Sequence, residues 1–198
     1  IMAFPNSFFY QNTLQILPDD TPGALRQTAN LPFDAQAARY GLESVVALRR
    51  VLFLSTPTDE GGAAQKTNRH EAVLIADLVG AFQRLYDGRP LSIGVITPYR
   101  AQIARIRAEL ESRQIQPDEL TIDTVERYQG GARDVILISL CTNSLSALSS
   151  LISLSDDGVD RKLNVALTRA REHVVVVGNA ELLRENETYA QFIAMYSV

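Results

Sequence analysis

"LNVALTRAREHVVVVGN", residues Leu163–Asn179, passes from a helical pattern into four consecutive valines. An unbroken run of β-branched residues is typical of a strand buried on both faces, as in a parallel sheet with helices on each side. Two arginines, Arg169 and Arg171, stand directly before this run. The stretch therefore predicts a helix over residues 162–171, a buried strand over residues 173–178, and two cations where they meet.

The rest of the chain repeats this alternation of strand and helix. Short apolar runs predict four further strands, at residues 51–55, 91–97, 120–124 and 134–140. Asn68 and Glu71 form a capping pattern before one helix, and Pro98 is suited to open another. Strands that alternate with helices predict an α/β fold, a three-layer sandwich with a mostly parallel sheet of about five strands.

Composition excludes several classes of protein. With 198 residues and 46% hydrophobic content, the chain can form one sizeable core. No apolar run reaches the roughly 18 residues of a membrane span, so we expect a cytoplasmic protein with no membrane partner. The net charge of −4 disfavours a generally basic nucleic-acid binder. Nucleic acid would therefore have to bind at a local surface.

Cysteine and histidine are scarce. Cys141 is the one cysteine, and His70 and His173 are the two histidines, so we expect no metal ligands among the side chains. Cys141 lies in an apolar run and is expected to be a buried structural thiol.

Residues 1–50 differ from residues 51–198 in composition and in hydrophobic periodicity. They are rich in proline and weakly periodic, and "FPNSFFYQNTL", residues Phe4–Leu14, is their one compact apolar cluster. We expect a connecting segment with a short helix, followed by one domain over residues 51–198. Ile1 is not an initiator methionine, so we also expect the chain to be part of a longer protein.

Polar clusters follow the predicted strands. Thr97, Pro98 and Tyr99 follow one strand, and Thr124 ends another. Parallel sheets bind their ligands at the carboxyl ends of the strands. Arg169 and Arg171 precede their strand, so we expect them to reach the same edge from a helix through their long side chains.

The sequence contains no phosphate-binding glycine motif of the G-x-x-x-x-G-K-[ST] type. It offers fixed cations instead, which is what a second domain contributes when it completes a phosphoryl-transfer site across a cleft. An arginine finger acts in this way, because guanidinium stays charged and binds phosphate through two N–H groups. The alternative is that Arg169 and Arg171 are solvated or pair with Glu172.

Three segments, in order, resemble motifs IV, V and VI of superfamily 1 helicases. They are "ITPYRAQ" (96–102), "TVERYQGGARDVILISL" (124–140) and "RKLNVALTRAREHVVVVGN" (161–179). The most similar branch contains the nonsense-mediated-decay and Okazaki-fragment-processing helicases. The resemblance implies a RecA-like (P-loop NTPase-like) second motor domain that lacks its own P-loop and closes on ATP held by an N-terminal RecA-like domain of the same protein.

The resemblance also implies roles for individual residues. Arg169 would be the catalytic finger, and ATP would be bound with Mg²⁺ held mainly by the first domain. Contacts to ATP would come from Gln129, Gly130, Arg169 and Arg171. Contacts to single-stranded DNA or RNA would come from Thr97, Pro98, Tyr99 and Thr124. One residue departs from the family: Ala132 stands where the family usually has a glutamate, two residues after the "QG" of motif V, which weakens the expected nucleotide site.

Two other functions fit the same sequence less closely. One is an ATP-independent RecA-like module that binds nucleic acid or protein. The other is an ordinary α/β enzyme whose three ordered motif matches are accidental.

Overall fold

The computed structural model describes residues 1–15, 41–128, 131–152 and 160–198. Its elements in chain order are α1 (Ala3–Phe9), α2 (Gly41–Val46), β1 (Val51–Ser55), α3 (Glu60–Ala63), α4 (Arg69–Tyr86), β2 (Ile93–Thr97), α5 (Arg100–Ser112), the 3₁₀ helix η1 (Pro117–Glu119), β3 (Thr121–Thr124), β4 (Arg133–Ser139), α6 (Leu145–Leu151), α7 (Arg161–Leu167), β5 (Ala170–Gly178), α8 (Ala180–Leu183) and α9 (Glu187–Tyr196).

The five strands form one sheet in the order β1-β5-β4-β2-β3, and every pairing is parallel. The sequence-based prediction of a parallel five-stranded α/β sheet is therefore confirmed. β5 lies between β1 and β4, which explains its apolar sequence. β2 lies between β3 and β4 in the sheet, although β3 and β4 are consecutive strands in the chain.

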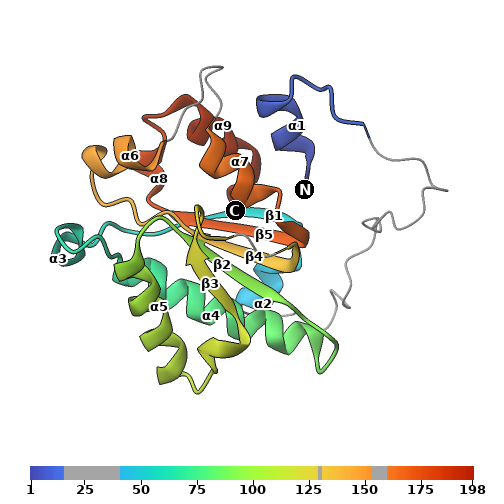
Figure 1. Ribbon diagram of the computed structural model, residues 1–198, viewed down its shortest axis with the longest axis vertical. Coiled ribbons are helices and arrows are strands. Elements are labelled where there is room, and N and C mark those ends of the chain that lie inside the picture. Colours follow the sequence, from blue (N-terminus) through green and yellow to red (C-terminus); the bar gives the residue numbers. More distant parts are fainter. Residues whose placement is uncertain (16–40, 129–130, 153–159) are drawn as a thin grey trace.

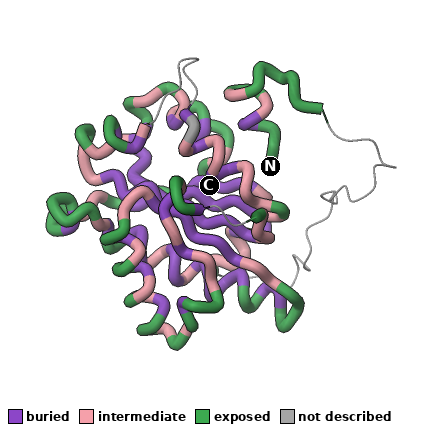
Figure 2. Tube along the Cα trace, in the orientation of Figure 1, coloured by how far each residue is buried: buried purple, intermediate pink, exposed green. Residues whose placement is uncertain are grey.

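Helices cover both faces of the sheet, and α2, α4 and α5 lie on the opposite face from α1, α6, α7, α8 and α9 (Figure 1). The four valines of β5 divide between the two sides. Val175 and Val177 belong to the core under α4, whereas Val174 and Val176 belong to the core under α7 and α9. Figure 2 shows the resulting band of buried residues along the strands, with exposed residues on the outer turns and loops.

Both ends of the predicted connecting segment pack on this body. The predicted short helix is α1, and its Phe4 meets Phe192 of α9 edge-to-face with ring centroids 5.1 Å apart. The sequence did not predict α2, which packs its fully buried Val46 in the core under α4. Among the described helices, none has the length and apolarity that a transmembrane span needs.

Helix α7 ends earlier than the sequence predicted. It stops at Leu167, and the Thr168 hydroxyl donates to the Asn164 carbonyl at 2.9 Å. Arg169 lies in the turn that follows, and Arg171 lies in β5 rather than in the helix. The reason is register: Ala170 already pairs with Arg133 of β4, so the backbone must be extended there.

Candidate functional site

The predicted site residues occupy two opposite edges of the sheet. Thr97 and Thr124 are register partners at the carboxyl ends of β2 and β3. Arg169 is at the amino end, where its carbonyl accepts from the N–H of Arg133, the first residue of β4, at 2.9 Å. A seven-residue strand is about 20 Å long, so one arginine side chain does not bridge the two edges. The expectation that both clusters share one edge is therefore wrong, because a residue that precedes a parallel strand lies at its amino end.

At the amino edge, Arg169 and Arg171 have different surroundings. Arg171 Nη1 lies 3.5 Å from Asp134 Oδ1, and Asp134 also accepts from the backbone and hydroxyl of Ser92. Arg169 makes no ion pair with any described residue, and its buried Nε has no hydrogen-bond partner among them. Arg171 is thus engaged within the domain, whereas Arg169 is available to an anion.

Tyr128 packs on β2, and the charge of Arg169 reaches its phenol group. Its phenol ring is buried over Gly94 of β2, so close that a Cβ at Gly94 would meet the phenol oxygen at 1.9 Å. Burial raises the pKa of Tyr128, and the guanidinium groups of Arg133 and Arg169 oppose that rise. Residues 125–128 therefore lead from the carboxyl end of β3 onto the face of β2.

A phosphate group fits the chemistry of this edge. A partly buried guanidinium with an unpaired Nε and no acidic partner within the described chain is suited to a multiply charged oxyanion. Gln129 and Gly130, the other predicted nucleotide contacts, lie outside the described residues. Ala132 is half-buried and directly precedes Arg133, whose N–H is bonded to Arg169.

At the carboxyl edge, the four predicted nucleic-acid residues differ in exposure. Thr97 is 1% exposed and Thr124 is 7% exposed, so both are buried, and the Thr97 hydroxyl is itself inaccessible to solvent in this structure. Pro98 and Tyr99 are partly exposed. Lys66 Nζ stands 5.4 Å from the centroid of the Tyr99 ring. Of the four residues, Tyr99 has the side chain best placed for contact with a ligand.

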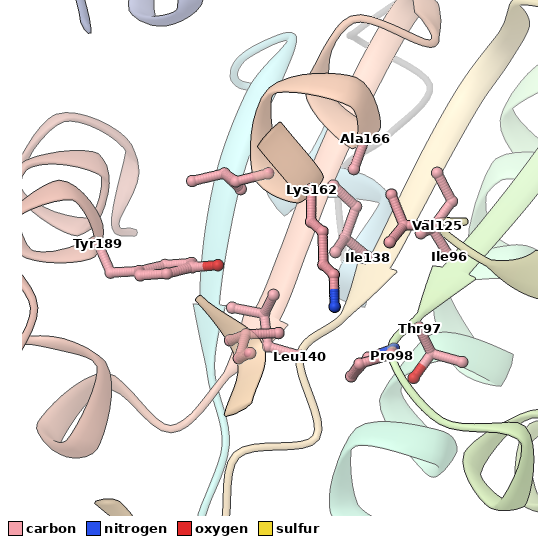
Figure 3. Close-up of a pocket in the computed structure, with 11 residues that line it drawn as sticks. Ile96, Thr97, Pro98, Val125, Ile138, Leu140, Lys162, Ala166 and Tyr189 are labelled. Carbon is pink, nitrogen blue, oxygen red and sulfur yellow. The ribbon is translucent and has the colours of Figure 1, made fainter. Parts of the chain in front are cut away.

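A small pocket lies beside these residues, between the ends of β2 and β4 and the start of α7 (Figure 3). Its walls are mostly apolar, and the side chain of Lys162 extends along it toward Pro98 and Leu140. Lys162 Nζ also lies 2.9 Å from Glu126 Oε1. The cavity volume is about 30 Å³, close to that of one water molecule. It is too small for a nucleotide base.

A buried polar network ties the loops of the carboxyl edge together. The Glu71 carboxylate accepts from the Ser139 hydroxyl at 2.7 Å and from the Cys141 N–H at 2.8 Å. Burial raises the pKa of Glu71 from 4.5 to about 7, and these hydrogen bonds limit the rise. Asn68 caps α4 as predicted, but Glu71 does not return to the cap as in a capping box, because Ser139 and Cys141 bind it.

Sequence reasoning missed Lys66 and Gln102, which belong to this edge. Gln102 is fully buried and bonds to Asn68 and Ser139. Gln102, Ile106 and Leu110 are the buried residues of α5, each four positions after the last. That spacing places Gln102 on the inward face of the predicted helix and would have identified it as a buried polar residue. No comparable signal marks Lys66.

Comparisons with known proteins give the family. The chain matches the model of a family described as an AAA domain over residues 1–181. It is 38% identical over 190 residues to the DNA polymerase alpha-associated DNA helicase A of Saccharomyces cerevisiae, a match that covers 93% of this chain and 26% of that protein. The chain belongs to the superfamily 1 helicases.

Two further relatives agree with this assignment. The chain is 33% identical over 201 residues to the Regulator of nonsense transcripts 1 homolog of Arabidopsis thaliana, covering 99% of this chain and 15% of that protein. It is 30% identical over 195 residues to a "Probable helicase" of Dictyostelium discoideum, covering 98% and 18%. The resemblance indicated by motifs IV, V and VI is confirmed. The chain spans less than a third of the length of each of these helicases.

Proposed function

We propose that this chain is the C-terminal motor domain of an ATP-dependent superfamily 1 DNA or RNA helicase. In this role it supplies an arginine finger to ATP and part of the surface that binds single-stranded nucleic acid. The observation that carries the proposal is the state of Arg169: it has no acidic partner among the described residues, whereas its neighbour Arg171 is paired with Asp134. A fold without a phosphate loop has little other use for such a cation at the edge of its sheet.

Arg169 would act on charge rather than on protons. ATP, bound with Mg²⁺ to an N-terminal RecA-like domain, supplies the phosphoryl group that is transferred to water. Closure of the two domains brings the Arg169 guanidinium onto the phosphate oxygens, where it stabilises the negative charge that develops as the bond breaks. The backbone hydrogen bond from Arg133 N–H to the Arg169 carbonyl helps to hold the turn that carries Arg169.

β3 and β4 follow one another in the chain and contribute to opposite edges of the sheet. Thr124 ends β3 at the edge where the single nucleic-acid strand would bind, and Arg133 begins β4 at the other edge, where its N–H donates to the Arg169 carbonyl. Opening and closing of the two domains would shift the single nucleic-acid strand once per ATP hydrolysed.

An ATP-independent binding module remains the second candidate, and Ala132 is the observation that favours it. A methyl group beside the predicted nucleotide site accepts no hydrogen bond, so the site lacks a polar contact that the family usually has. This alternative predicts strand binding without turnover.

Steady-state ATP hydrolysis by the full-length protein separates the two functions. We expect the 198-residue chain alone to hydrolyse no ATP, and the full-length protein to be stimulated by single-stranded oligonucleotide. Arg169→Ala should lower kcat by about 10³-fold or more, and Arg169→Lys should restore little because it lacks the guanidinium fork.

Arg171→Ala is the matched control, because it removes a guanidinium two residues away that is already paired with Asp134. For the same reason, the ATP contact that the family resemblance implied for Arg171 is not part of the proposed site. It should keep most of the turnover. Equal losses in the two alanine variants, or a full-length protein that binds strands but hydrolyses no ATP, would contradict the proposed function.

A further inference from the structure

The two lysines of the chain, Lys66 and Lys162, both lie at the carboxyl edge next to Tyr99. Lys66 places its ammonium 5.4 Å from the centroid of the Tyr99 ring. Burial raises the pKa of the Tyr99 hydroxyl, and the charge of Lys162 works against that rise. Tyr99, the one aromatic residue among the predicted nucleic-acid contacts, thus has Lys66 over its ring and lies within reach of the charge of Lys162.

Lys66 is the more available of the two lysines. Its side chain is exposed, and no described carboxylate lies within ion-pair distance of it, whereas Lys162 is paired with Glu126. The backbone of Lys66 is left-handed, with φ of 55°, which is unusual for a residue other than glycine. Its N–H donates to Ala63 at 3.3 Å, and the next N–H donates to Gly62 at 3.0 Å. The turn therefore holds Lys66 in a defined position.

Gln102 fixes this turn against the helix that begins after Tyr99. Its side-chain oxygen accepts from the N–H of Asn68 at 2.8 Å, and its amide group donates to the carbonyl of Asn68 at 2.9 Å and to Ser139 Oγ at 3.1 Å. Asn68 lies two residues after Lys66, and Gln102 lies three residues after Tyr99. One buried amide therefore sets the distance between the lysine and the ring.

We propose that Lys66 and Tyr99 form a one-nucleotide subsite for a single strand, in which the ring stacks on the base and the lysine binds the adjoining phosphate. Gln102 is its positioning residue. The subsite rests on the proposed function and adds to it a phosphate contact outside the three motifs. Single strands bind to such combinations of an aromatic platform and a nearby cation. On binding, the base displaces the Lys66 ammonium from the face of the Tyr99 ring, and the ammonium pairs with the adjoining phosphate.

The salt dependence of binding tests Lys66. We would titrate the full-length protein with fluorescent oligodeoxythymidine and oligouridine from low to high salt, and use the polymer that wild type binds more tightly. Lys66→Ala should weaken binding roughly five- to ten-fold near 50 mM salt and reduce the slope of log affinity against log salt by about 0.7, because one phosphate contact is lost. Lys66→Arg should keep the wild-type slope.

Arg107→Ala is the control for a general loss of positive charge. Arg107 is partly exposed and pairs with Asp118 at 2.9 Å next to η1, at the opposite edge of the sheet. Its removal should leave affinity and slope unchanged.

A double-mutant cycle tests Gln102, with Gln102→Met chosen because it keeps the volume and removes the hydrogen bonds. A positioning residue acts through Lys66, so Gln102→Met should reduce the salt slope by itself and add little loss to Lys66→Ala. Ser139→Ala, which removes one of the three bonds to Gln102, is the milder variant if Gln102→Met proves unstable. An additive loss with an unchanged slope would show that the network is only structural and would overturn this part of the proposal.

The outcomes separate this inference from the proposed function. If Tyr99→Ala weakens binding while Lys66→Ala changes neither affinity nor slope, the subsite is wrong and the helicase assignment stands. If wild type binds neither polymer, both fail.

Discussion

At the scale of single residues, Arg169 and Arg171 show that ion pairing within the domain determines which cation can bind an external anion. Both arginines lie where α7 gives way to β5, and residue type alone does not distinguish them. Strand register places Arg171 beside Asp134 and leaves Arg169 in the preceding turn. The family resemblance singled out Arg169, but residue type and spacing did not predict that Arg171 pairs with Asp134 while Arg169 has no acidic partner among the described residues, because that pairing depends on β4, about 35 residues earlier in the chain.

Ala132 gives a prediction at this scale. We expect Ala132→Glu in the full-length protein to lower the KM for ATP by roughly ten-fold or more, because a charged hydrogen bond typically contributes about 1.5–3 kcal/mol. Arg133 could compete for the new carboxylate, but it already donates to Thr121 Oγ1 at 3.0 Å.

Gly131→Glu is the matched control for Ala132→Glu. A Cβ at Gly131 meets nothing within 4 Å, so this substitution adds the same charge one residue earlier in open space. An unchanged KM in Ala132→Glu, or the same fall in both variants, would show that position 132 has no specific contact with the nucleotide.

Gly94 gives a prediction about stability. A Cβ at this position would lie 1.9 Å from the Tyr128 hydroxyl and 2.8 Å from Ile136 Cδ1. Gly94→Ala should therefore lower the free energy of unfolding by about 1–3 kcal/mol, as overpacked cores do. Adding Tyr128→Phe should restore part of that loss, because it removes the closest contact.

Chemical unfolding of the four chains (wild type, the two single variants and the double variant) measures the effect of Gly94→Ala. Gly131→Ala serves as a neutral glycine control. If Gly94→Ala is as stable as wild type, Tyr128 does not pack on β2.

At the scale of elements, sequence predicted what depends on local patterns. The valines of β5 predicted a strand buried on both faces, and the structure divides them between two cores. The end of α7 could not be predicted in the same way, because Ala170 pairs with a distant strand. The edge that carries Arg169 was predictable in principle, since a residue before a parallel strand lies at its amino end. Thr97 and Thr124 were expected to face a ligand, but burial depends on packing that the sequence does not reveal.

Helix α4 carries a pH-dependent contribution to stability through Glu71. Its folded pKa is about 7, against 4.5 for an exposed glutamate. Between these values the folded state holds a proton that the unfolded state has lost, so rising pH favours unfolding. The contribution is complete below pH 4.5 and is lost as pH rises through 7, and it amounts to about 3 kcal/mol.

His173 of β5 has the opposite sign, because burial lowers its pKa from 6.5 to about 3, and its contribution is lost as pH falls through that range. Comparing Glu71→Gln with wild type cancels the histidine. We expect wild type to lose stability relative to Glu71→Gln as pH rises from 4.5 to 7. A difference in unfolding free energy that stays constant over this range would show that Glu71 is ionised throughout.

At the scale of the whole molecule, the sheet separates two tasks. ATP would meet Arg169 at the amino edge, and the strand would meet Tyr99 and Lys66 at the carboxyl edge, with β4 between them. This separation of the ATP site from the nucleic-acid site is the central claim, because a motor domain must bind the two ligands at distinct places and link their occupancy. The separation also predicts that a substitution at the ATP edge leaves the affinity for nucleic acid unchanged, and the reverse.

The most direct test of that claim is the affinity of the full-length Arg169→Ala variant for a single-stranded oligonucleotide, measured at equilibrium without ATP. We predict an affinity within about two-fold of wild type, although ATP turnover falls by about 10³-fold or more. A loss of affinity as large as that of Tyr99→Ala would contradict the separation of the two sites, because it would mean that Arg169 contacts the single strand rather than ATP.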